Sequence, residues 1–215
     1  MILPFLAVVA AAKAPCSDAA SVEQQSAVMK NLYDDYEDAR EDRFATELLS
    51  DEARKADKRR VKEARKYDKQ DKLCTGQDKW YAAWIMQSST DFEDLQRAYQ
   101  LATQTMEERV PRGPWLTAYT YDRMRTADGY RQAFGTQTRV DKENRRCLIE
   151  LDGTVDDKKR QAYSVPPLGS LYRQVLDMNG FDKDAPTETR MRRRSLMCEP
   201  VAQFDIGTTR KAPGN

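Results

Sequence analysis

Asp122 and Arg123 form an adjacent pair of opposite charges in a segment rich in aromatic residues. An unpaired charge is costly to bury in such surroundings, so these side chains either form hydrogen bonds with neighbouring polar groups or face a cleft. In the first case they belong to a buried hydrogen-bond network that fixes how helices pack. In the second case, Arg123 binds an anionic group, and Asp122 either acts as a base or orients a base. The sequence leaves both interpretations open.

The 215 residues include no histidine. This removes the usual general base near neutral pH and the commonest nitrogen ligand of zinc. It excludes Ser-His-Asp triads, Cys-His dyads and HExxH metal sites. We expect neither a metal site nor a cofactor, and Asp122 is the candidate catalytic residue.

The alternative enzymatic function is a carboxylate-dependent hydrolase acting on an envelope component such as a cell-wall sugar. Such an enzyme needs two acids whose pKa values are held apart. Asp122 is the first candidate, and the second is Asp34, Asp35 or Glu37. The spacing of these residues does not show whether they meet.

The charges of the chain nearly cancel, with 36 basic and 35 acidic residues and a net charge of +1. A balanced molecule offers no strong overall field to attract nucleic acid, so we expect no nucleic-acid partner. No nucleophile–base pair is recognisable either. The function favoured by the sequence is therefore a binding or interaction module, with an envelope component or another protein as its partner.

An apolar, uncharged run from Ile2 to Ala12 begins the chain, and small residues directly precede Lys13. These are features of a signal peptide over residues 1–12. The run is too short to span a bilayer, so we expect no transmembrane segment after the leader is removed. The predicted location is the periplasm or the exterior.

Four cysteines are spread widely along the chain: Cys16, Cys74, Cys147 and Cys198. An even number of separated cysteines in an exported protein is typical of disulfides. Three pairings are possible, and the sequence does not choose among them. A zinc site with four thiolate ligands is a weaker alternative, because no two cysteines form a CxxC pair.

The predicted fold is a compact, mainly α bundle of about five to six helices with a small β-hairpin near residues 134–153. Apolar residues recurring every three or four positions predict helices over 21–49, around Trp80, after a capping box of Thr90 and Glu93, after Pro114, and from Leu168. Residues 51–72 are mostly charged and predict a solvated helix, with a charged interaction arm as the alternative.

Residues 21–182 are expected to form a single domain, followed by a mostly irregular tail over 183–215. Trp80, Trp84 and Trp115 lie at helical spacing. Such spacing favours core positions, with a sugar-stacking platform as the alternative.

Several short motifs share their letters and spacing with one known family: Ala82-Ala83-Trp84-Ile85, Gln87, Phe92 with Gln96, Tyr119 with Asp122-Arg123, Gly129, and Phe134-Gly135-Thr136-Gln137. Through them the chain resembles the bacterial domain of unknown function 6624 family, mainly over residues 80–137. The family has Gln-His where this chain has Gln87-Ser88. The resemblance implies a helical fold and a candidate binding site, but no reaction. The site residues are Gln87, Tyr119, Asp122, Arg123, Thr136 and Gln137.

Overall fold

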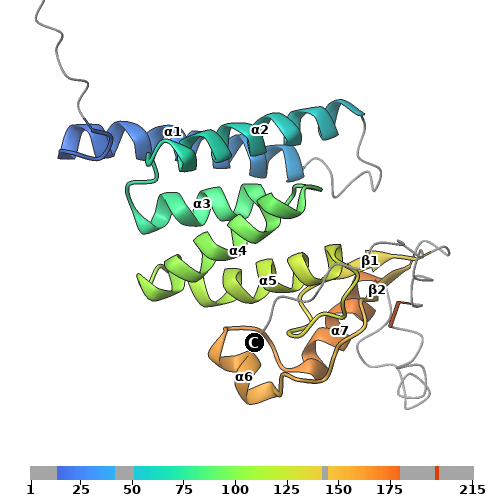
Figure 1. The fold of residues 1–215 in the computed structure, drawn as a ribbon. Coiled ribbons are helices and arrows are strands. Elements are labelled where there is room, and N and C mark those ends of the chain that lie inside the picture. Colours follow the sequence, from blue (N-terminus) through green and yellow to red (C-terminus); the bar gives the residue numbers. More distant parts are fainter. Residues whose placement is uncertain (1–13, 42–50, 142–144, 180–196, 199–215) are drawn as a thin grey trace, which may run out of the picture.

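The structure is a computed structural model that describes residues 14–41, 51–141, 145–179 and 197–198. Within these ranges the chain forms seven helices and one two-stranded antiparallel sheet (Figure 1). The mainly helical class with a small hairpin is confirmed. None of the described helices is both long and apolar enough to cross a membrane. The predicted leader lies outside the described residues, as does all of the predicted tail except residues 197–198, and the domain boundaries stay a prediction.

Five helices make up the first part of the fold: α1 (Ala19–Glu41), α2 (Asp51–Lys69), α3 (Gly76–Met86), α4 (Phe92–Glu107) and α5 (Gly113–Ala127). The long helices α1 and α2 lie side by side at one end of the molecule, and α3 and α4 separate them from α5 (Figure 1). These elements match the helices predicted from apolar spacing. The predicted extension of the first helix over 42–49 lies outside the described residues.

The helix starts show one correction to the sequence analysis. Helix α4 is capped by Asp91, whose side chain accepts from the backbone N–H of Glu93, so the predicted Thr90–Glu93 capping box is wrong. A capping box does occur at α3, between Thr75 and Asp78. Both aspartate and threonine are good caps, and the choice between adjacent candidates depends on where the backbone turns. Pro114 lies in the first turn of α5, as expected.

The second part of the fold contains β1 (Thr138–Val140), β2 (Arg146–Leu148), α6 (Asp157–Ala162) and α7 (Leu168–Met178). The two strands pair antiparallel, with Arg139 opposite Cys147, and form the predicted hairpin. Helix α6 was not predicted from the sequence. Six residues are too few to show a helical period, although Asp156 caps its first turn by accepting from the backbone of Lys159.

Helix α5 is shared by two hydrophobic clusters. Leu116 belongs to the cluster formed by α1 to α5, whereas Ala118 belongs to one formed with the loops and helices that follow. Helices α4 and α5 approach closely at Gly113, where a Cβ atom would lie 2.9 Å from the backbone of Thr105. Helix α5 therefore fixes the second part of the fold against the first.

Two disulfides connect distant parts of the chain. Cys16 is bonded to Cys74, which joins the segment before α1 to the loop between α2 and α3. Cys147 in β2 is bonded to Cys198, whose backbone N–H also donates to Leu148 O at 2.8 Å. The prediction of disulfides is confirmed, and because no cysteine is free the four-thiolate zinc site is excluded.

Replacing both Cys147 and Cys198 by alanine is expected to lower the free energy of unfolding by about 4 kcal/mol, because the bridge closes a loop of roughly 50 residues in the unfolded chain. Urea unfolding of the variant and the oxidised wild type measures the difference. Reduced wild-type protein should be at least as unstable as the variant. Equal midpoints for variant and oxidised wild type would contradict the expectation.

Candidate functional site

The Asp122 carboxylate lies at the centre of the predicted site, on α5, and is 0% exposed. Its Oδ1 accepts from the backbone N–H groups of Ala133 at 2.7 Å and Phe134 at 3.0 Å. Its Oδ2 accepts from the backbone N–H of Thr136 at 3.0 Å and from the Thr136 hydroxyl at 2.8 Å. The loop after α5 thus wraps its donors around one carboxylate.

Two glutamines complete this arrangement. Gln132 is fully buried and donates to the backbone carbonyls of Gln137 and Ile149, while its Oε1 accepts from the N–H of Gln137. The Gln137 side chain donates to Tyr119 O and to the Thr136 hydroxyl, both at 3.2 Å. The structure therefore brings Asp122, Thr136 and Gln137 together, as the site prediction required, in a network of satisfied hydrogen bonds.

Burial raises the pKa of Asp122 above its ordinary value, and the donors from Phe134, Thr136 and Ala133 oppose that shift. Both carboxylate oxygens are engaged by the loop. This geometry supports the interpretation of Asp122 as a positioning residue for residues 132–137, because a general base needs a lone pair directed at a reacting group.

The other predicted residues lie where α5 meets α3 and α1. The Arg123 guanidinium donates through Nε to the backbone carbonyl of Gln87 at 3.3 Å, and the Gln87 side chain donates to the Tyr36 hydroxyl at 3.2 Å. Tyr119 packs against the rings of Trp84 and Trp115. Gln87, Arg123 and Tyr119 thus join helices, and among the described residues no ion pair links Arg123 to Asp122.

The three tryptophans form part of a row of rings across α1, α3 and α5. Trp80 is 5% exposed and stacks on Trp84, which contacts Trp115. Trp84 Nε1 donates to Glu37 at 2.6 Å, and the Arg112 guanidinium lies over the rings of Trp80 and Trp115. Ring faces covered by other rings and by a guanidinium suit core packing better than a sugar-stacking platform.

The candidate carboxylates for the hydrolase each have a partner outside any shared cavity. Asp34 pairs with Lys30 at 2.6 Å, and Asp35 with Arg60 at 2.6 Å. Asp35 lies beside that guanidinium, which holds the pKa of the carboxyl below its ordinary value. Glu37 accepts from Trp84. No observation here favours the hydrolase, which stays a prediction.

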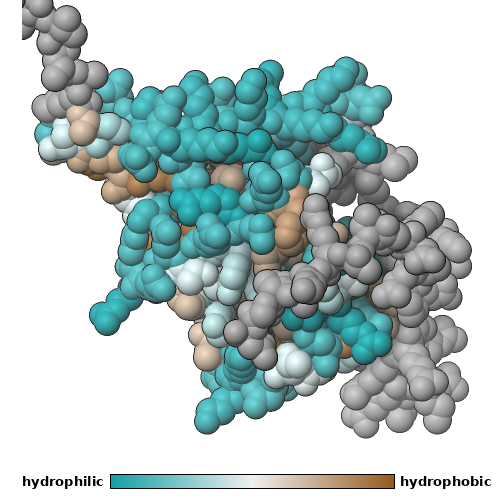
Figure 2. All heavy atoms as spheres, in the orientation of Figure 1, coloured by the Kyte–Doolittle hydropathy of each residue, from teal (hydrophilic) through white to brown (hydrophobic). Residues whose placement is uncertain are grey.

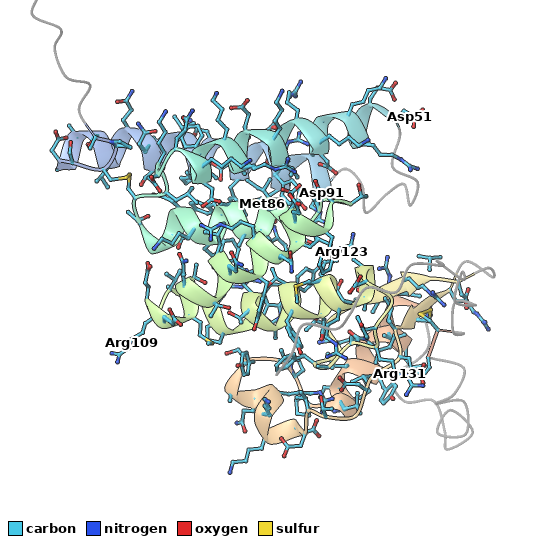
Figure 3. The ribbon with its side chains drawn as sticks, viewed as in Figure 1. Asp51, Met86, Asp91, Arg109, Arg123 and Arg131 are labelled. Atoms are coloured by element: carbon cyan, nitrogen blue, oxygen red, sulfur yellow. A yellow bond between two sulfur atoms is a disulfide. The ribbon has the colours of Figure 1, made fainter. Side chains whose placement is uncertain are left out.

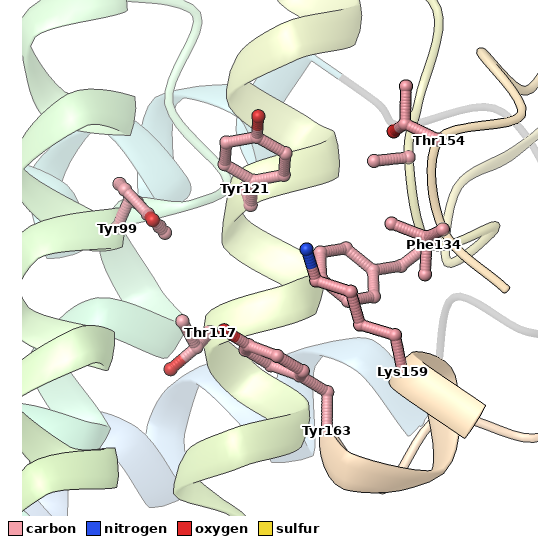
Figure 4. A pocket seen from close by; sticks show the side chains of 9 residues that line it. Tyr99, Thr117, Tyr121, Phe134, Thr154, Lys159 and Tyr163 are labelled. Atoms are coloured by element: carbon pink, nitrogen blue, oxygen red, sulfur yellow. The ribbon is translucent and has the colours of Figure 1, made fainter. Parts of the chain in front are cut away.

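A cavity of about 220 Å³ lies where α4 and α5 face α6, next to the loop that Asp122 holds (Figure 4). Phe134 packs against both Tyr121 and Tyr163, at centroid distances of 6.1 and 4.8 Å. Tyr99 packs against Tyr121 at 5.4 Å, and burial raises the pKa of the Tyr99 hydroxyl above its ordinary value. The wall of the cavity is formed by Tyr99, Thr117, Tyr121, Ala133, Phe134, Thr154, Val155, Lys159 and Tyr163.

Lys159 on α6 reaches into this cavity, with its ammonium toward the rings of Tyr121 and Phe134 (Figure 4). No carboxylate of the described residues pairs with it, whereas its neighbour Arg160 is buried and bonded to the Phe134 carbonyl and to Asp157. The cavity thus combines four aromatic rings with one available cation. Aromatic rings beside a few polar groups also occur in ligand pockets, and at about 220 Å³ this cavity is smaller than the roughly 300–1,000 Å³ of pockets for drug-sized ligands.

Most of the residues that line the cavity were not predicted from the sequence. Lys159 and Tyr163 belong to or follow α6, the helix that was not predicted. Tyr99 and Tyr121 lay on predicted helices, but nothing in their spacing distinguished them from core residues. Phe134 was noticed only as part of the family-like motif.

Comparisons with known proteins identify no relative of this chain. No model of a known protein family matches, so the resemblance to the domain of unknown function 6624 family stays a prediction. No curated protein matches, and no solved structure matches. The candidate site consequently depends on geometry and chemistry alone.

Asp122→Ala is expected to lower the free energy of unfolding by more than about 3 kcal/mol, because it strands buried backbone donors of residues 133–136. Chemical unfolding followed by circular dichroism measures the loss. The control is Asp38→Ala, which removes an exposed carboxylate on α1 and should cost less than about 0.5 kcal/mol. Similar losses in the two variants would show that the Asp122 network does not hold the loop.

Proposed function

We propose that this protein is an exported binding module that holds a small ligand in the cavity beside α6. The observation that carries the proposal is the meeting of four aromatic rings with the unpaired Lys159 ammonium in one cavity. Two disulfides support the export part, because such bonds persist in oxidising compartments outside the cytosol. The predicted leader agrees with this view.

The cavity chemistry favours a planar ligand that carries a negative charge. Rings from Tyr99, Phe134 and Tyr163 offer apolar faces and edges to a flat group. The Lys159 ammonium then pairs with an anionic substituent such as a carboxylate. A cationic ligand would be repelled by the same ammonium, and a volume of about 220 Å³ limits the bound group to a small one.

The Asp122 network has a defined part in this function. Because Asp122 binds the backbone of Ala133 and Phe134, it places the Phe134 ring in the cavity wall. Arg160 holds the same loop from the other side by donating to Phe134 O at 3.0 Å. Asp122 and Arg160 are thus positioning residues, while the side chains of the wall touch the ligand.

Titration with benzoate, followed by amide chemical shifts in the full disulfide-bonded protein, tests this function. Benzoate is expected to shift residues around Phe134 and Lys159 saturably and to bind about tenfold more tightly than neutral benzyl alcohol, since a charged hydrogen bond contributes roughly 1.5–3 kcal/mol. Lys159→Met should abolish that preference. The neighbouring, exposed Lys158 is outside this cavity, so Lys158→Met serves as the matched control.

Two results of this titration would contradict the proposed function. Shifts that do not saturate, or that map elsewhere on the molecule, would refute a ligand site in the cavity. An equal loss of preference in the two methionine variants would refute the part assigned to Lys159.

A further inference from the structure

Helix α2 separates its charges by sign, although its sequence mixes them. From Lys55 to the end of the helix, its acidic side chains turn toward the protein or the helix margin: Asp57 pairs with the buried Arg60, Asp68 pairs with Arg97 on α4 at 2.7 Å, and Glu63 pairs with Lys66. Asp51 and Glu52, in the first turn, are exposed. A nearly balanced net charge of the whole molecule is therefore combined with a local concentration of cations on α2.

Six cationic residues lie on the solvent face of α2, and five of them, all except Lys58, recur every three or four positions, the spacing of one helical stripe. All six are exposed: Lys55, Lys58, Arg59, Lys62, Lys66 and Lys69. Four of them, Lys55, Lys58, Lys62 and Lys69, have no ion-pair partner among the described residues. From Lys55 to Lys69 the stripe is about 21 Å long. Figures 2 and 3 show this edge of the molecule as hydrophilic, with long side chains pointing away from the fold.

This arrangement has an electrostatic cost. Like charges three or four residues apart on a helix repel one another and destabilise it. A bound polyanion relieves that repulsion and displaces counterions, so the stripe forms a surface for a ligand with regularly spaced negative charges.

A flat anionic bilayer fits the stripe poorly. Helix α1 lies beside α2 and carries exposed carboxylates, including Asp35, which bonds to Arg60 across the two helices, and Asp38. A flat surface would meet these carboxylates as well as the cations. The exposed large apolar residues of the described chain are all outside α2, and a helix that lies in a membrane interface needs an apolar face.

Nucleic acid also fits less well than a polymer of carboxylates. Single strands bind through stacking on aromatic rings, but the only aromatic residue of α2 is Tyr67, which packs against the core. Five of the six cations are lysines, which bind anionic groups singly as point charges, so the stripe suits a polymer that presents its charges one at a time. A polyuronate carries one carboxylate on each sugar, a repeat similar to one helical turn of about 5.4 Å.

From these observations we propose that the solvent face of α2 binds a linear acidic polysaccharide, with one polymer chain lying along the stripe from Lys55 to Lys69. This surface is separate from the cavity beside α6. Its function does not depend on whether the cavity binds a ligand.

Isothermal titration of the full disulfide-bonded protein with polygalacturonate of uniform length tests the proposal. The double variant Lys58→Gln/Lys62→Gln should bind about tenfold more weakly than wild type, and the slope of log K against log salt should fall by roughly one for each lysine. The matched control, Lys158→Gln/Arg173→Gln, removes two exposed cations from α6 and α7 and should bind as wild type does. Lys159→Met should also bind normally.

Neutral dextran, single-stranded DNA and phosphatidylglycerol vesicles serve as competing ligands. Preference for polygalacturonate over all three, lost in the α2 variant alone, supports the proposal. Absent binding, an equal loss in the control variant, or tighter binding of DNA or vesicles would overturn it. Circular dichroism of each variant verifies that the helix content is unchanged.

Discussion

The buried carboxylate of Asp122 is the constraint on which the second part of the structure depends. A charge removed from water is tolerated only when donors replace its hydration, and here a single loop supplies them from Ala133, Phe134 and Thr136. The low local dielectric strengthens each of these bonds, so the loop conformation and the buried carboxyl group stabilise one another. Everything that follows α5, from the hairpin to α7, starts from the position this loop defines.

The cavity arises from the same constraint. Helix α5 presents apolar residues to two clusters on its opposite sides, and the loop after it brings Phe134 into the second. Large rings from α4, α5 and the end of α6 meet there without filling the space between them. A small helix then adds one cation to the wall. The hydrogen-bond network and the cavity are thus adjacent parts of one arrangement, in which the polar residues recognised in the sequence lie behind the aromatic residues of the cavity wall.

Most residues of the hydrogen-bond network were predicted from the sequence, but Gln132 was not, and neither was the separate role of each predicted residue. Asp122, Thr136 and Gln137 do meet, whereas Gln87 and Arg123 join the end of α3 to α5. The cavity was invisible because two of its residues come from α6 and its flanking turn, where six helical residues give no readable period. On α2 the mixed charges indicated a solvated helix, but the segregation of signs depends on which residues Arg60 and Arg97 reach.

What the sequence determined by itself is local or compositional: the helices that follow from apolar spacing, the hairpin, the absence of histidine chemistry and the presence of disulfides. Only the tertiary structure decided which cysteines pair, which donors surround Asp122 and which face of α2 remains in water. The physical reason is the distance along the chain between the residues that interact. Periodicity reports how a residue relates to neighbours within a turn or two, whereas these contacts join groups 11 to 58 positions apart in the chain. Their distances are set by how complete helices pack.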